Sequence, residues 1–305
     1  MKRELTLAYV ALLAVCIIWG TTYLALRIAV LHFPPLLFSA IRQSTAGLIL
    51  LGLMFTFSKA KFPPKEHLIR QAIGGFFMIS MGNGLVAWAE MEIPSGIAAI
   101  ICSLMPVMVI LINLSVNREE KPTLPIVLGV IIGMTGIVTI FSEHVNEFAK
   151  TEYRIGIVLI LLAVLGWAAG SIWIKKQPSD SNPFVNAGLQ MFFGGLWLFP
   201  FSLLFDDLQA VHWSGESLYS LLYLIVFGSI IAYASYLYAL KKLPMTIVSL
   251  YAYVNPLVAV VLGWAILNEK LNGVIGVGIL ITIAGIYIVN RGYQISRLWK
   301  AKTAR

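Results

Sequence analysis

The chain has 305 residues, of which 59% are hydrophobic and only 12% are charged, and its mean hydropathy is +0.86. One soluble core cannot hide that much apolar surface, so the composition excludes an ordinary soluble domain and indicates a multi-pass membrane protein. The net charge of +8 does not indicate nucleic-acid binding, because the basic residues are scattered and form no face interleaved with aromatic residues.

Ten apolar segments are long enough to cross a bilayer core about 30 Å thick as helices. They lie at residues 5–30, 35–57, 68–88, 95–116 and 124–141 in the first half, and at 155–174, 183–205, 218–240, 246–267 and 273–289 in the second. We therefore predict an all-α membrane protein with ten transmembrane helices. The first segment is predicted to be a span and not a signal peptide, because it is too long and no small-residue cleavage site follows it.

Basic residues orient these segments, because short cytoplasmic loops retain Lys and Arg. With a cytoplasmic N-terminus, 17 of the 22 Lys and Arg residues fall in cytoplasmic segments, and only Lys150, Arg154 and Lys270 fall outside. The alternation between basic cytoplasmic loops and less basic outer loops holds along the whole chain. It predicts that both termini are cytoplasmic and that residues 291–305 form a basic cytoplasmic tail.

Arg42 lies seven residues into the second segment, about 10 Å from its outer end. A charge at that depth should face the bundle interior or a cavity. Two roles remain open: a structural or gating ion pair, with Glu90 or Glu92 as the partner, and direct contact with an anionic substrate group such as a carboxylate. In the alternative interpretation of the glutamates, both face external water.

Pro106 lies about ten residues into the fourth segment, near the bilayer midplane, and Pro256 has the same place in the ninth. A proline in a helix interior leaves one carbonyl without its N–H partner. We expect two kinks that shape a central cavity or let the helices bend, with Ser103 and Asn255 as candidates to satisfy the freed carbonyls. Packing alone is the other explanation.

The two halves of the chain are related by an offset of 148 to 150 residues. The matching pairs are Trp19 with Trp167, Arg27 with Lys175, Pro35 with Pro183, Arg42 with Gln190, Gly47 with Gly195, Pro94 with Pro244, Pro106 with Pro256, and Glu119 with Glu269. Because each half has five spans, the second must enter the membrane from the opposite side. This predicts inverted repeats at residues 1–141 and 155–290, joined by an external linker at 142–154, as in secondary transporters with a midplane site.

The duplicated patterns "IPSGIAAIICSLMPVMVILINLSVNREEKPTLPIVLGVIIGMTGIVTI" and "LPMTIVSLYAYVNPLVAVVLGWAILNEKLNGVIGVGILITIAGIYIV", with "PPLLFSAIRQSTAGLIL", resemble the paired EamA modules of the drug/metabolite transporter superfamily. The resemblance covers nearly the whole chain. It implies a ten-helix carrier of the bacterial inner membrane, usually an exporter of amino acids or other small metabolites, with a central cavity between the modules. An arginine commonly occupies the place of Arg42 in this family.

Aromatic and amide side chains lie in the spans that the family uses for its cavity, and such side chains can bind a ligand by stacking and hydrogen bonds. The candidate substrate-binding residues are Trp19, Tyr23, Arg42, Asn83, Trp88, Trp167, Tyr233, Tyr251 and Asn255. Taken singly, each of these aromatic residues is more often part of an interfacial belt or of helix packing. Glycines of the fifth and tenth segments are expected to let helices approach closely, namely Gly129, Gly133, Gly136, Gly276, Gly278 and Gly285.

The expected function is secondary transport of a small molecule, without a cofactor or a metal, by a monomer or homodimer in the lipid bilayer. No acidic residue falls near the centre of a span, which favours facilitated diffusion or exchange over proton antiport, although Glu90 leaves antiport open. Cys16 and Cys102 are expected to act as small apolar residues, and Glu119 and Glu269 to start helices. The alternatives are a membrane enzyme, for which Asp206, Asp207 and His212 are the nearest cluster, and a receptor or channel.

Overall fold

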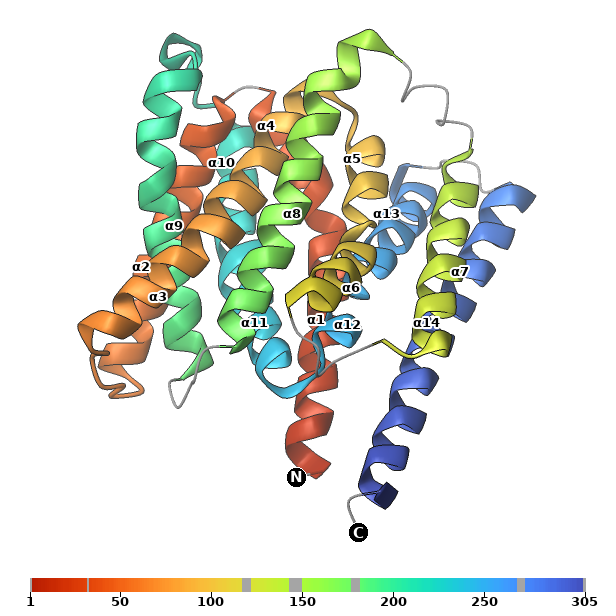
Figure 1. The fold of residues 1–305 in the computed structure, drawn as a ribbon. Helices are drawn as coiled ribbons and strands as arrows, with labels where there is room; N and C mark the ends of the chain where they lie inside the picture. Colours follow the sequence, from red (N-terminus) through yellow and green to blue (C-terminus); the bar gives the residue numbers. More distant parts are fainter. Residues whose placement is uncertain are drawn as a thin grey trace.

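The computed structural model describes residues 2–31, 33–116, 122–142, 150–176, 182–267 and 272–303, and its regular structure there is entirely helical (Figure 1). The first half contains α1 (Lys2–Val30), α2 (Pro35–Thr56), α3 (Lys65–Gly75), the π-helix η1 (Phe76–Gly84), α4 (Leu85–Glu92), α5 (Ser95–Cys102), α6 (Met105–Val116) and α7 (Leu124–Ile140). The second half contains η3 (Thr151–Tyr153), α8 (Arg154–Lys176), α9 (Pro183–Phe205), η4 (Leu208–Ala210), α10 (Gly215–Tyr223), the π-helix η5 (Leu224–Ile231), α11 (Ala232–Lys242), α12 (Met245–Val248), α13 (Tyr251–Leu267) and α14 (Gly273–Thr303).

Eight helical segments of the described chain are long and apolar enough to cross a membrane. Two of the ten predicted spans correspond to shorter apolar helices, at Ile97–Ile112 and Leu124–Ile140. The predicted tail is not a separate element as far as Thr303, because α14 continues through it. Glu119 and Glu269, expected at helix starts, lie outside the described residues.

The fourth and ninth predicted spans are each interrupted near their middle. The first breaks at Ser103–Leu104, between α5 and α6, and the second at Ser249–Leu250, between α12 and α13. Pro106 is therefore the second residue of α6 and not the centre of a continuous helix, so the predicted kink at Pro106 is replaced by a break. A proline in the first helical turn removes no intrahelical hydrogen bond, which makes this position favourable.

Pro256 lies inside α13, as expected, and its missing N–H leaves the carbonyl of Ala252 without an α-helical partner. The hydroxyl of Ser103 donates to that carbonyl over 3.0 Å. The predicted compensation is confirmed for Ser103, and this bond joins the broken region between α5 and α6 to the start of α13.

Equivalent helices of the two halves pack against each other in antiparallel pairs. In the pair of α2 and α9, a Cβ at Gly47 would lie 2.5 Å from the amide nitrogen of Phe192, and a Cβ at Gly195 would lie 2.5 Å from that of Ser44. These contacts are reciprocal under the 148-residue offset. Glycine at both positions allows a backbone approach that any larger side chain would prevent.

The pair of α7 and α14 follows the same rule at one side of the bundle (Figure 1). A Cβ at Gly129 would lie 2.9 Å from the carbonyl of Gly285, and one at Gly278 would lie 2.9 Å from that of Gly136. The expectation of close approach is confirmed for five of the six glycines. It is wrong for Gly276, where a Cβ would meet no neighbouring atom within 4 Å, so this glycine faces away from the contact.

α1 begins and α14 ends at the same end of the bundle, which we call the terminal end (Figure 1). Lys242, at the end of α11, lies there as well, because it forms an ion pair of 3.4 Å with Glu4. At the opposite end Asp206, following α9, accepts the amide of Leu37 over 2.7 Å and so caps the first turn of α2. Asp207 accepts the amide of Gln209, so both carboxylates of the candidate enzyme cluster have structural roles.

Candidate functional site

A cavity of about 90 Å³ lies between the two halves of the chain, beside the second half of α1. Both halves contribute to its wall. The lining residues are Trp19, Thr22, Tyr23, Leu26, Arg42, Gly82, Asn83, Val86, Cys102, Met105, Ala163, Val164, Trp167, Tyr251 and Asn255.

Seven of the nine predicted site residues line this cavity, and Trp88 and Tyr233 do not. Trp88 faces another part of the bundle, where its ring centroid lies 5.3 Å from that of Phe205. Tyr233 is only 2% exposed and donates to the side-chain carbonyl of Gln190. The other wall residues, among them Thr22 and Met105, were not predicted, because small and aliphatic side chains in an apolar span give no signal in the sequence.

Arg42 reaches the cavity from α2 although it is only 5% exposed. Its Nε donates to the hydroxyl of Ser229 on η5 over 3.0 Å, which fixes the guanidinium in the cavity wall. Among the described residues Arg42 has no carboxylate within 4.0 Å, so the predicted ion pair with Glu90 or Glu92 is not formed here. Glu90 does act electrostatically on Arg42 from a greater distance.

Glu90 is completely buried near the end of α4, so the alternative that it faces water is wrong. Neither of its carboxyl oxygens has a hydrogen-bond partner in the described part of the chain. The two cations that act on it are Arg27 and Arg42. Glu92 is partly exposed and lines a separate hollow at the surface.

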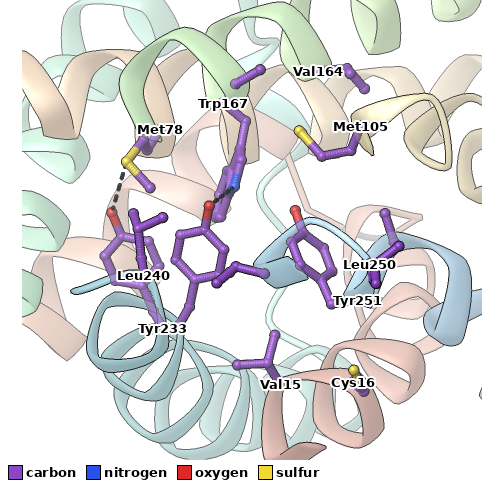
Figure 2. Close-up of a cluster of buried hydrophobic side chains, with 14 of the residues drawn as sticks. Val15, Cys16, Met78, Met105, Val164, Trp167, Tyr233, Leu240, Leu250 and Tyr251 are labelled. Carbon is purple, nitrogen blue, oxygen red and sulfur yellow. Dashed lines mark hydrogen bonds between the residues drawn. The ribbon is translucent and has the colours of Figure 1, made fainter. Parts of the chain in front are cut away.

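Aromatic side chains from three helices form a cluster in the wall of the cavity nearest the terminal end. The ring centroids of Trp19 and Trp167 are 5.3 Å apart with their planes at 84°, and Trp19 and Tyr251 are 4.9 Å apart at 74°. Behind them the hydroxyl of Tyr236 accepts the indole N–H of Trp167 over 3.2 Å. In Figure 2 this bond is the dashed line that ends at the indole of Trp167, and Val15 and Cys16 of α1 lie below it.

Two π-helices stand at equivalent places in the third span of each half, and both touch this aromatic cluster. On η5 the carbonyl of Gly228 accepts the indole N–H of Trp19 over 2.9 Å. On η1 a Cβ at Gly82 would lie 2.6 Å from the ring of Trp167, so only glycine leaves room for that indole. Short π-helical turns free backbone groups from the regular ladder and are common at functional sites.

The two predicted amides hold backbone groups of the cavity wall. Asn255, with its amide nitrogen oriented to match its neighbours, donates to the carbonyls of Cys16 and Tyr251 over 3.0 Å each. Asn83 donates a longer bond of 3.5 Å to the carbonyl of Met78. Asn255 therefore ties α1 to α13 at the cavity, as a buried amide that needs partners should.

The two ends of the bundle differ in how their corresponding cations are paired. Lys175, the counterpart of Arg27, donates to the carbonyls of Leu240 and Leu243, where α11 ends. Arg27 has a buried Nη1 with no partner among the described residues. The two corresponding cations thus differ in their hydrogen bonding, although the two halves match in sequence.

These observations define a class: a multi-pass helical membrane protein of two matching modules with a polar and aromatic cavity between them. The model of the EamA-like transporter family matches residues 6–142 and 154–291, and the chain belongs to this family.

Curated relatives agree with this assignment. The "Uncharacterized inner membrane transporter YedA" of Escherichia coli K12 is 30% identical over 295 residues, which cover 95% of this chain and 92% of that protein. "Protein PecM" of Dickeya dadantii is 30% identical over 288 residues, covering 93% of each chain. A solved crystal structure superposes with a TM-score of 0.73 over 94% of this chain and 96% of that chain at 17% identity, and therefore shares the fold.

Proposed function

We propose that this chain is a secondary transporter that exports small metabolites bearing an anionic group across the inner membrane, with amino acids and related compounds as the leading class. The observation that carries the proposal is the cavity itself, built from both modules and combining one fixed guanidinium with indole, phenol and amide groups.

The chemistry of the wall favours a carboxylate at one end of the ligand and an apolar or aromatic body at the other. Arg42 lies in the cavity wall and can bind a carboxylate through two parallel hydrogen bonds. The faces of Trp19 and Tyr251 provide apolar contact and cation–π attraction for an ammonium group. A zwitterion would satisfy both ends without leaving a buried charge unpaired.

We propose alternating access between two inverted modules as the mechanism. The reciprocal contacts of Gly47 and Gly195 support it, because a two-fold relation places equivalent residues against each other in this way. With the charge-based topology, the terminal end is cytoplasmic, so the aromatic cluster lies on the cytoplasmic side of the cavity. In the other state we expect Arg27 to donate to backbone carbonyls at the end of α4, as Lys175 donates to those at the end of α11 here. Lys175 would then lose its bonds to the end of α11.

Counterflow in proteoliposomes tests the proposal directly. Vesicles loaded with one unlabelled amino acid or organic anion are diluted into its labelled form, over a panel that includes aliphatic, aromatic and acidic amino acids. Uptake above that of empty vesicles is expected for at least one compound, and Arg42→Ala should abolish it while Arg42→Lys retains part. If no compound of the panel exchanges in vesicles that hold correctly folded protein, the proposed function is wrong.

The native thiols provide a test of alternating access. Cys102 lines the cavity, whereas Cys16 is buried and only 6% exposed. In Cys16→Ser protein, a membrane-impermeant maleimide should label Cys102 from the outer side in right-side-out vesicles and less from the inner side in inverted ones. A saturating substrate should change that ratio. Equal labelling from both sides, with and without substrate, would contradict a gated cavity.

A further inference from the structure

Glu90 is a buried acidic residue, and the proposed cavity does not explain why a carboxyl group lies there. It lies two residues before the end of α4, and α1, α2, η1, α5 and α8 all pack against this helix. Its side chain is 0% exposed, and both carboxyl oxygens lack a partner within the described residues. A buried carboxyl group without hydrogen bonds is rare and requires a reason.

Charges approach Glu90 from two helices. Arg27 on α1 and Arg42 on α2 both act on it, although neither lies within the 4.0 Å of an ion pair. The titratable groups that face it are Tyr23 on α1 and Cys102 on α5. η1 has no charged residue, and α8 brings only Arg154 of its first turn near this end, where the side chain is exposed.

An ionised carboxylate would be strongly disfavoured where Glu90 lies, because nothing solvates it and no donor among the described residues bonds to it. The same group becomes favourable as an anion if a guanidinium moves onto it. Arg42 is the guanidinium that also borders the cavity, so the Glu90 carboxylate and an anion in the cavity compete for one cation. When the cavity holds an anion, Arg42 is engaged there and cannot move onto Glu90, so the Glu90 carboxyl group binds a proton.

We propose that Glu90 is a proton-binding site whose occupancy is linked to anion binding at Arg42, so that a proton travels with each anionic substrate. The step is a single proton transfer: a solvent proton binds a carboxylate oxygen of Glu90 as the substrate anion binds Arg42, and both leave together on the other side. The inference rests on the proposed function and specifies its coupling as symport, in which a metabolite accumulated in the cytoplasm leaves with a proton. Linkage is reciprocal, so acid pH should tighten anion binding as anion binding promotes protonation.

The first experiment needs no ligand. Infrared difference spectra of the protein in liposomes, recorded from acid to alkaline pH, report the C=O stretch of protonated carboxyl groups. One titrating band should vanish in Glu90→Gln and persist in Glu92→Gln, the matched control two residues away on the same helix. In Arg42→Gln the proton affinity of Glu90 should rise roughly tenfold, the effect of one nearby charge at an effective dielectric constant of about 20, and Arg42→Lys should restore it.

A band that does not titrate, or a titration that Arg42→Gln leaves unchanged in protein shown to be folded, would overturn the proposal. The second experiment uses benzoate as an anionic probe, together with any substrate found by counterflow. Net flux of an anion in vesicles that contain a pH-sensitive dye should move about one proton per anion in the wild type and in Glu92→Gln. Glu90→Gln should keep exchange but lose proton movement. Anion flux without proton movement in the wild type contradicts the linkage alone, whereas absence of any flux contradicts the transport function.

Discussion

The bond between Ser103 and the carbonyl of Ala252 gives a quantitative test of how the broken helices are held. Pro256 removes the normal partner of that carbonyl, so Ser103→Ala leaves a buried acceptor unsatisfied. The hydroxyl also lies 2.8 Å from the carbonyl of Ala99, so one proton is shared between two acceptors. Interhelical hydrogen bonds in membranes average about 0.6 kcal/mol and reach about 1.7, and we expect a loss of about 1 kcal/mol.

A double-mutant cycle isolates this effect. In Pro256→Ala the new N–H at position 256 can bind the carbonyl of Ala252, so Ser103→Ala should then cost about 1 kcal/mol less than in the wild-type background. The assay is the free energy of unfolding in lipid bicelles. Ser249→Ala is the matched control, because the hydroxyl of Ser249 donates within its own turn, to the carbonyl of Thr246 over 2.9 Å. If Ser103→Ala and Pro256→Ala are additive within about 0.3 kcal/mol, the compensation that we infer does not exist.

Three further predictions concern the cavity and the helix contacts. Arg42→Ala should weaken binding of a carboxylate substrate about 10- to 150-fold, the equivalent of one charged hydrogen-bonding group at about 1.5 to 3 kcal/mol, and equal affinity in direct binding assays would remove Arg42 from the site. Gly285→Leu forces a Cβ against the amide nitrogen of Gly133 and should destabilise by about 1 to 3 kcal/mol in the same unfolding assay, whereas Gly276→Leu should cost less than about 0.5. Lys175→Met removes two bonds to the end of α11 and should increase maleimide labelling of Cys102 from the cytoplasmic side about tenfold; unchanged labelling would show that this contact does not hold the cavity closed.

The sequence by itself determined the class of the protein and seven of the side chains that line its cavity. These features depend on composition, on apolar length and on a repeat that is local in the chain, and all three can be read without knowing any contact. Arg42 belonged to this group, because a charge far inside an apolar segment must face away from lipid. The glycines of α7 and α14 likewise indicated that helices approach closely there, but that these two helices pair with each other came from the structure.

Tertiary structure alone decided which face of a helix meets the cavity. Trp88 and Tyr233 were wrongly predicted to line the cavity. Each of them follows a π-helix in its own span, η1 in the first half and η5 in the second. A π-helical turn contains an extra residue, so side chains beyond it are rotated relative to an uninterrupted α-helix, in which each residue turns about 100°. The burial of Glu90 was also decided by the tertiary structure, because a residue near a helix end is shielded from solvent only when other helices pack around it.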